Sequence, residues 1–330
     1  MSARPIGPRS AAALGSGTAF LLYPTALSAH PPVGPGEFWS AWNWDPWILL
    51  LLGIAVTTYL TGVRRLWRRA GRGRGIPRWR AGAYLLGVWT LYAALVSPLH
   101  ALGHSLFSLH MLQHMLLMVV AAPLLVLGHP GTAFVWAFST RWRLRLGMLL
   151  RAPPLSTGWK FVAHPASVLL LHVGALWVWH LPALYEAALS HHWVHTIEHA
   201  SFLLTAILFW WVLASHGGYR RWSGYGAAIL YVFATALQSG ALGALITFAP
   251  RRWYVGHEVG ATLWGTDALA DQQLAGVLMW VPAGLVYAAA ASALLVLLLR
   301  STGQEMRRRE RAVERGWSPR RWDPTFDPRA

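Results

Sequence analysis

Residues 107–127 read FSLHMLQHMLLMVVAAPLLVL, an apolar stretch of 21 residues without a lysine, arginine or carboxylate. A helix of about 20 apolar residues is long enough to cross the hydrocarbon core of a bilayer. Six further apolar stretches have a similar length, so the sequence predicts an all-α, polytopic membrane bundle of seven transmembrane helices. The expected spans lie at 47–63, 81–99, 107–127, 162–181, 196–214, 224–248 and 272–299.

The composition of the whole chain agrees with a membrane protein. Hydrophobic residues make up 55% of the 330 residues and charged residues only 12%, about half the share found in soluble proteins. The chain has no cysteine, which excludes disulfide scaffolds, thiolate metal sites and cysteine nucleophiles. It also lacks a recognisable Ser/His/Asp arrangement and a phosphate-binding glycine loop, so we expect no enzymatic activity.

The net charge of +16 reflects topology. Eight arginines lie at 64–80, five basic residues at 141–160, two at 220–221, and nine from residue 300 onward, together 24 of the 28 basic residues. These are alternate loops and the C-terminal segment, so the positive-inside rule predicts an external N-terminus and a cytoplasmic C-terminus. The other side is acidic and histidine-rich, so the charge gives no support to nucleic-acid binding.

Three regions follow from this threading. Residues 1–29 resemble a signal peptide or an N-terminal anchor, because Arg4 and Arg9 precede an apolar stretch that ends at Ser28-Ala29. Residues 30–300 form the seven-helix membrane domain. Residues 301–330 form a basic cytoplasmic tail.

Two pairs of histidines begin two of the expected spans. His110 and His114 are four residues apart at the start of the third span, as are His195 and His199 at the start of the fifth. Residues at this spacing share one face of a helix. Both spans run inward, so we expect the four imidazoles to converge near the external surface if the helices are neighbours. Polar groups at this depth need a compensating partner, and we predict a metal site.

Further candidates accompany the two pairs. Met111, Met115 and Met118 form a stripe beside the first pair, and Asp271 begins the seventh span four residues after Asp267. Imidazole suits copper, zinc and iron, whereas thioethers select cuprous copper. Histidines beside methionines, without cysteine, therefore favour copper. The secondary ligand candidates are Met111, Met115, Met118, His180, Asp271 and Met279.

Other functions remain open at this stage. Histidines on two helices at equal depth are compatible with a haem-binding membrane redox protein, and a copper transporter would need polar groups continuing to the cytoplasmic side. His195-Thr-Ile-Glu-His199 also spells the inverted zincin pattern of a zinc protease.

The motifs at these positions resemble a known family. They are HMLQHMLLM at 110–118, APLLVLGHP at 122–130, HLPALYE at 180–186, HTIEH at 195–199, FWW at 209–211 and DQQLAGVLMWVP at 271–282. In order and spacing they are similar to the polytopic CtaG family of cytochrome c oxidase assembly factors, the group associated with caa-type oxidases, over residues 40–300. The resemblance implies a multi-pass protein of the bacterial plasma membrane that matures a haem-copper oxidase at its copper step. The implied partners are an oxidase subunit, an external copper donor and the lipid bilayer, and homo-oligomerisation stays open.

Overall fold

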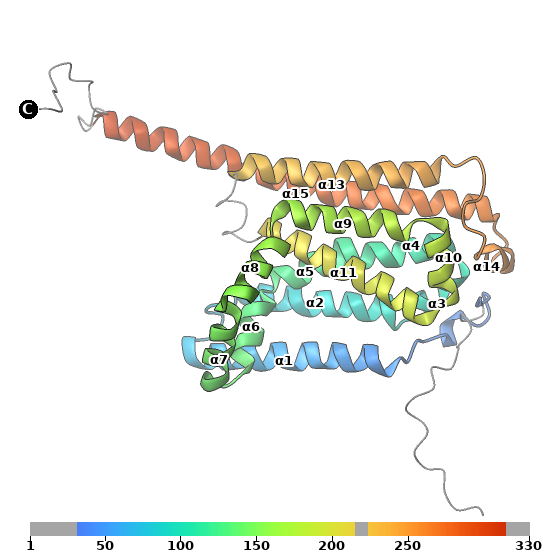
Figure 1. Ribbon diagram of the computed structural model, residues 1–330, viewed down its shortest axis with the longest axis horizontal. Coiled ribbons are helices and arrows are strands. Elements are labelled where there is room, and N and C mark those ends of the chain that lie inside the picture. Colours follow the sequence, from blue (N-terminus) through green and yellow to red (C-terminus); the bar gives the residue numbers. More distant parts are fainter. Residues whose placement is uncertain (1–31, 215–223, 315–330) are drawn as a thin grey trace, which may run out of the picture.

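The computed structural model describes residues 32–214 and 224–314, which form a bundle of helices without any strand in these two ranges (Figure 1). The prediction of a signal or anchor at 1–29 lies outside the described residues. The helices are η1 (Phe38–Ser40), α1 (Pro46–Ala70), α2 (Arg78–Leu95), α3 (Pro98–Ser105), α4 (Phe107–Met115), the π-helical η2 (Leu116–Ala121), α5 (Ala122–Leu127), α6 (Pro130–Ala137), α7 (Thr140–Arg151), α8 (Pro153–Val162), α9 (Pro165–Trp179), α10 (Pro182–Ser190), α11 (His192–Ala214), α13 (Gly224–Thr247), α14 (Glu258–Leu263) and α15 (Ala268–Glu314).

Five of the described helical segments are long and apolar enough to cross a membrane: α1, the run from α4 to α5, α11, α13 and α15. Two further pairs, α2 with α3 and α8 with α9, pass the same test jointly but are bent by 46° and 61°. The all-α, multi-span prediction is therefore confirmed, with five to seven candidate spans. The exact number of seven and the orientation stay predictions.

The bundle has apolar outer flanks, and it buries a cluster of polar side chains among the apolar residues of its core. Leu170, Leu230 and Leu285 are each exposed by about two thirds or more on the flanks of the helices, at 72%, 67% and 69%. His110 and Glu198 are fully buried. Apolar surface of this extent marks contact with lipid. Polar side chains buried inside such a bundle are costly and commonly functional, so they are the candidate functional residues.

Prolines and capping side chains set the starts of the helices around the site. Pro98 and Pro165 occupy the first turns of α3 and α9, where the missing N–H costs nothing. The side chain of Ser97 accepts a hydrogen bond from the N–H of Leu99, and His164 accepts one from Ala166. The bend between α2 and α3 at this point turns α3 toward the interior.

The third span contains a wide π turn between α4 and α5. It covers Leu116–Ala121, directly after His114 and Met115 and just before Pro123. Proline lacks the N–H that an α-helix would use, and π turns are common at functional sites. Trp210 of α11 donates its Nε1–H to the carbonyl of Met118 at 2.9 Å, which fixes α11 against this turn.

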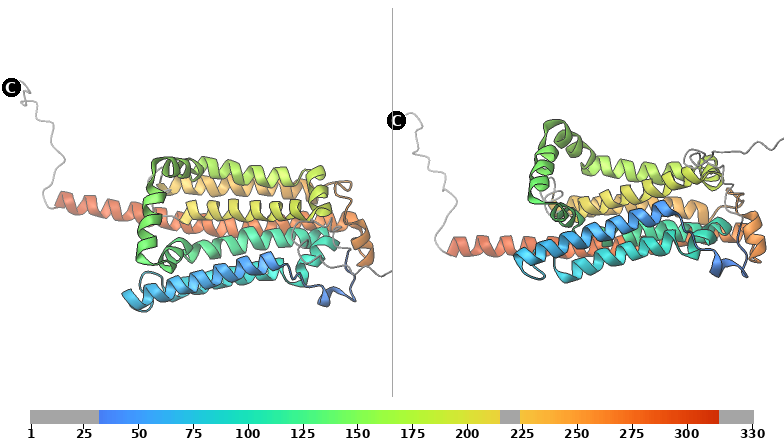
Figure 2. Two further views of the ribbon diagram at one scale, coloured as in Figure 1. Left: turned by 60° about the horizontal axis from the view of Figure 1, so that its bottom comes forward. Right: turned by 90° about the horizontal axis from the view of Figure 1, so that it is seen from below.

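The two ends of the bundle differ in chemistry. The arginine-rich junction of α1 and α2, the helices α6 to α8 and the extension of α15 lie at one end (Figures 1 and 2). The short helices α3, α10 and α14 lie at the other end, beside the histidines. α15 passes through Arg300 without a break and projects beyond the bundle (Figure 1).

Close packing of α1 on α6 allows a stability prediction. A Cβ built on Gly62 would lie 1.8 Å from the carbonyl oxygen of Ala133, whereas one built on Gly53 meets nothing within 4 Å. We expect Gly62→Ala to lower the free energy of unfolding by about 1–3 kcal/mol through overpacking. We expect Gly53→Ala to raise it by about 0.5–1 kcal/mol, because alanine favours the helix. Thermal unfolding of the two purified variants measures both changes. Equal stabilities of the two variants would contradict the close contact of α1 with α6 at Gly62.

Candidate metal centre

Two pairs of histidines converge between α4 and α11. His110 and His114 have ring centroids 4.4 Å apart on α4, and His195 and His199 have centroids 4.1 Å apart on α11. Across the interface, the ring centroids of His110 and His195 are 5.3 Å apart, and those of His114 and His199 are 5.0 Å apart. The four imidazoles therefore meet with the pairing in depth that the sequence predicts.

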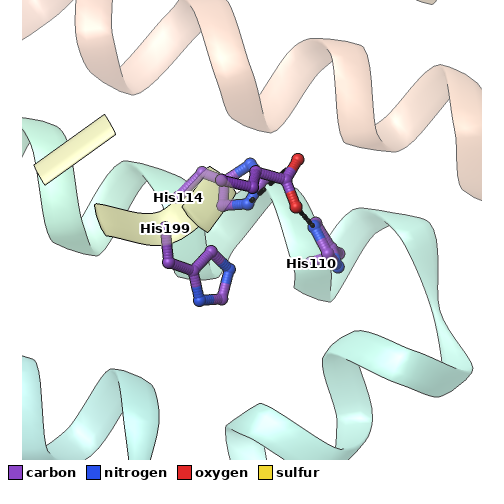
Figure 3. A group of neighbouring side chains, drawn as sticks. His110, His114 and His199 are labelled. Atoms are coloured by element: carbon purple, nitrogen blue, oxygen red, sulfur yellow. Dashed lines mark ion pairs between the residues drawn. The ribbon is translucent and has the colours of Figure 1, made fainter. Parts of the chain in front are cut away.

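A buried carboxylate lies among these rings, as Figure 3 shows for His110, His114 and His199. Oε2 of Glu198 is 3.8 Å from Nε2 of His110, and Oε1 is 3.9 Å from Nε2 of His114. These separations are too long for hydrogen bonds. They are close to the distance of about 3.4 Å between neighbouring ligands in a tetrahedral site with bonds of 2.1 Å. His110, His114, Glu198 and His199 each offer one ligand atom within 4.8 Å of the others.

The ligand atoms of this group have no hydrogen-bond partner in the described part of the chain. They are Nε2 of His110, both ring nitrogens of His114, Nε2 of His199 and both carboxylate oxygens of Glu198. Leaving one buried polar group unsatisfied costs about 1–3 kcal/mol, and more for a charged group. A bound metal ion would satisfy one nitrogen of each of the three histidines together with the carboxylate, so the residues fit a metal.

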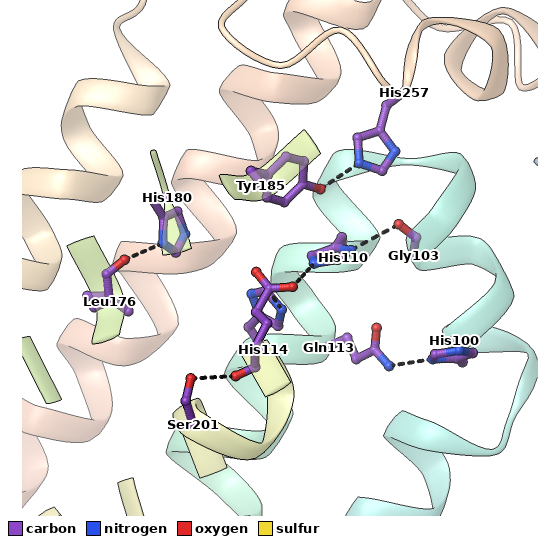
Figure 4. A network of polar contacts seen from close by, with 11 residues as sticks. His100, Gly103, His110, Gln113, His114, Leu176, His180, Tyr185, Ser201 and His257 are labelled. Carbon is purple, nitrogen blue, oxygen red and sulfur yellow. Dashed lines mark hydrogen bonds and ion pairs between the residues drawn. The ribbon is translucent and has the colours of Figure 1, made fainter. Parts of the chain in front are cut away.

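Hydrogen bonds at the back of two rings orient their free nitrogens (Figure 4). Nδ1 of His110 donates to the carbonyl of Gly103 at 3.2 Å, and Nδ1 of His180 donates to the carbonyl of Leu176 at 2.7 Å. In a neutral imidazole this leaves the lone pair on Nε2, as metal-binding histidines commonly arrange it. His180 lies beside the group, with its ring centroid 6.5 Å from that of His114.

A second group of histidines adjoins the first. His100 and His104 of α3 and His195 of α11 bring one ligand atom each within 4.8 Å of the others. Gln113 of α4 donates to Nδ1 of His100 at 3.1 Å and to the carbonyl of Ala94 at 2.7 Å, which holds α3 against α4. We call His110, His114, Glu198 and His199 the histidine–glutamate centre, and His100, His104 and His195 the adjoining triad.

The loop between α13 and α14 closes over this end of the bundle. Tyr185 hydrogen-bonds Nε2 of His257 at 2.6 Å, and the hydroxyl of Tyr254 donates to the carbonyl of His180 at 2.8 Å. Oε1 of Glu186 accepts hydrogen bonds from the N–H groups of Val255 and Gly256. Burial lowers the pKa of His257 in this loop to about 3, so His257 is neutral and available as a hydrogen-bond acceptor.

The secondary candidates do not all join the centre. Asp271 caps the start of α4: its carboxylate accepts from the N–H groups of Phe107 and Ser108, at 2.7 and 3.3 Å, and from the hydroxyl of Ser108. Its oxygens are therefore already occupied by hydrogen bonds. The structure gives Asp271 a positioning role for His110 and His114.

The methionines gather at a different place. Met115, Met118 and Met279 line a small buried cavity together with His172, while Met111 is buried in the apolar core that they share. The predicted stripe and the histidine pairs are therefore parts of two separate groups.

The ligand candidates from the sequence did not include His100, His104 or Glu198. The spacing of four between His100 and His104 was a usable signal, but the turn of α3 that brings them inward was not visible in the sequence. Glu198 shares a helix face with His195 and His199, which was also available as a signal.

The geometry bears on one of the alternative functions, the zinc protease. Glu198 is fully buried and His199 is only 8% exposed, so a peptide could not reach them as it would reach the cleft of a protease. The imidazoles of α4 and α11 lie opposite one another across the interface, with ring centroids 5.0 to 5.9 Å apart.

Comparisons with known proteins agree with the sequence motifs. The profile of the cytochrome c oxidase caa3 assembly factor family matches residues 57–301. The chain is 28% identical over 255 residues to the uncharacterised protein ML1998 of Mycobacterium leprae, and 27% identical over 259 residues to the uncharacterised protein Mb0105 of Mycobacterium bovis. These alignments cover 74% and 73% of this chain but 37% of each relative, so the chain spans little more than a third of the curated relatives it matches. No solved structure matches the chain significantly.

Proposed function

Because the chain belongs to the cytochrome c oxidase caa3 assembly factor family, we propose that its histidine–glutamate centre binds copper and assists the transfer of copper to a subunit of the oxidase. The observation that carries this proposal is the set of buried ligand atoms without partners on His110, His114, Glu198 and His199. Imidazole and carboxylate together suit copper, zinc or iron, and the oxidase named by the family favours copper among these.

Charge supports a monovalent ion at this centre. Glu198 is the only acid of the group, and its negative charge would balance Cu⁺ in a site that water does not reach. A divalent ion would leave a net positive charge in the bundle, which is costly at this depth. Copper would thus be the cargo of the protein, received from an external donor and passed to the oxidase.

The position of the basic residues supports an external location for the centre. The arginine-rich end of the bundle would face the cytoplasm of a bacterial cell, which places the opposite end, with α3, α10 and α14, on the outside. A copper donor and an oxidase subunit would then meet the protein from the external side of the plasma membrane.

The test is metal analysis of the purified protein beside the variant His110→Ala/His114→Ala/His195→Ala/His199→Ala. We expect the variant to lose one equivalent of copper. We also expect oxidase purified from cells that carry it to contain less copper. The control is His191→Ala/His192→Ala, which removes two exposed histidines at the junction of α10 and α11 and should leave the copper content unchanged.

Other outcomes would point to the rival functions. Unchanged copper in a folded quadruple variant would refute the assignment of the site. A strong Soret band in the purified protein would support a haem protein instead, and preferential loading with zinc in competition with copper would overturn the choice of metal.

A further inference from the structure

A small cavity lies in the core beyond the histidine–glutamate centre, toward the middle of the bundle. Its lining includes three thioethers and one imidazole, from Met115 of α4, Met118 of the π turn, Met279 of α15 and His172 of α9, beside two hydroxyl-bearing and three apolar residues. All four side chains are buried. The space open to the centre of a water-sized sphere is about 10 Å³, which is enough for one water molecule or one ion.

The hydrogen bonds of His172 leave a ligand lone pair. The hydroxyl of Thr205 donates to the carbonyl of Ser201 at 2.8 Å, so its oxygen accepts from Nδ1–H of His172 at 3.0 Å. A neutral imidazole that donates from Nδ1 carries its lone pair on Nε2. The ring is also stacked on Phe209, with centroids 5.6 Å apart and planes at 24°. His172 is therefore held in place as a neutral ligand would be.

The donor set selects among metals. Thioether ligands favour cuprous copper over zinc and cupric copper. None of the described residues that line this cavity is acidic, so a divalent ion would carry its whole charge into a low-dielectric interior, at a high cost. A neutral set of three sulfurs and one nitrogen suits a soft, monovalent cation.

We propose that Met115, Met118, Met279 and His172 form a second copper site, specific for Cu⁺ and distinct from the histidine–glutamate centre. This inference rests on the proposed function in one respect, because it takes copper as the cargo. The two sites are adjacent along the third span, since Met115 follows His114 directly and Met118 lies one turn further on. The protein would then hold two copper ions at successive depths.

The alternative is that these methionines only fill the core, a common use of this flexible side chain. The test compares Met115→Leu/Met118→Leu/Met279→Leu with Met148→Leu/Met306→Leu. Leucine conserves the volume of methionine and is well tolerated in cores. Met148 and Met306 are 67% and 56% exposed, so the second variant removes sulfur without touching the cavity.

The full chain, purified in detergent, is titrated anaerobically with Cu⁺ and with Ag⁺ as a redox-inert substitute. We expect the core variant to bind one equivalent less of either ion than the wild type, and the surface variant to bind as much as the wild type. In protein labelled with selenomethionine, copper X-ray absorption should show a selenium neighbour that persists in the quadruple histidine variant and vanishes in the core variant. If the triple substitution prevents folding, Met118→Leu alone should weaken the selenium signal.

The outcomes separate the two proposals. Full stoichiometry in the core variant, with no selenium neighbour in the wild type, would overturn the second site while leaving the histidine–glutamate centre in place. A selenium neighbour together with unchanged binding in the quadruple histidine variant would support the second site and refute the first. Failure of the wild type to bind either ion would refute both.

Discussion

Glu198→Gln is expected to weaken copper binding by about 100-fold or more and, at the same time, to make the metal-free protein more stable. The carboxylate of Glu198 is fully buried and has no hydrogen-bond partner among the described residues. Ionising a carboxyl in this interior costs several kcal/mol, and the neutral amide of glutamine avoids that cost at almost the same volume. We expect the free energy of unfolding of the metal-free variant to rise by about 1–3 kcal/mol.

Thermal unfolding with and without copper measures both effects. At a copper concentration of 100 times the Kd, binding should stabilise the wild type by about 2.7 kcal/mol, and the variant should show little of this gain. Glu186→Gln is the control, because Glu186 accepts two backbone hydrogen bonds. We expect Glu186→Gln to lower the free energy of unfolding and to leave the stabilisation by copper unchanged. A less stable Glu198→Gln with normal copper binding would show that the carboxylate is not part of a metal site.

Asp271→Ala is expected to lower the free energy of unfolding by about 2–4 kcal/mol and to weaken copper binding as a consequence. Its carboxylate accepts three hydrogen bonds at the start of α4, from two backbone N–H groups and the Ser108 hydroxyl. Hydrogen bonds to a charged group contribute about 1.5–3 kcal/mol each, and loss of a helix cap costs about 0.5–2 kcal/mol. Without this cap the first turn of α4, which leads into His110, would fray.

The measurement is thermal unfolding together with a copper titration, and Asp267→Ala is the matched control. Asp267 is exposed and accepts one hydrogen bond, from Ala270, so its loss should cost less than about 1 kcal/mol. If Asp271 were a ligand, its replacement would abolish copper binding in a protein of normal stability. That result would contradict the capping role.

Much of the fold and part of the site could be predicted from the sequence. Long apolar stretches report the membrane spans, because the bilayer sets their length. The spacing of four within each histidine pair fixes one helix face, and the shared direction of the two spans fixes their relative depth. These local rules placed His110, His114, His195 and His199 at matching depths, and the structure meets the remaining condition, that the two helices are neighbours.

The remainder depended on which helices are neighbours, and spacing along one helix does not contain this information. Met115 and Met118 lie close to His114 in sequence but contribute to a cavity with α9 and α15. Asp271 has the spacing of a ligand pair with Asp267, yet the position of α4 makes it a cap. The 46° bend between α2 and α3 brings His100 and His104 inward, whereas the predicted span ended at residue 99 and left both histidines outside it.

The π turn at Leu116–Ala121 amounts to one additional residue held within the third span, because a π turn takes up one more residue per hydrogen-bonded turn than an α turn. Deleting one residue here would restore an ordinary α-helix and rotate everything after the turn by about 100° relative to His114. The number of residues between His114 and Pro123 therefore sets how the two groups of ligands are oriented relative to each other. Related sequences with the same number of residues here can preserve both groups, whereas those with one residue fewer cannot.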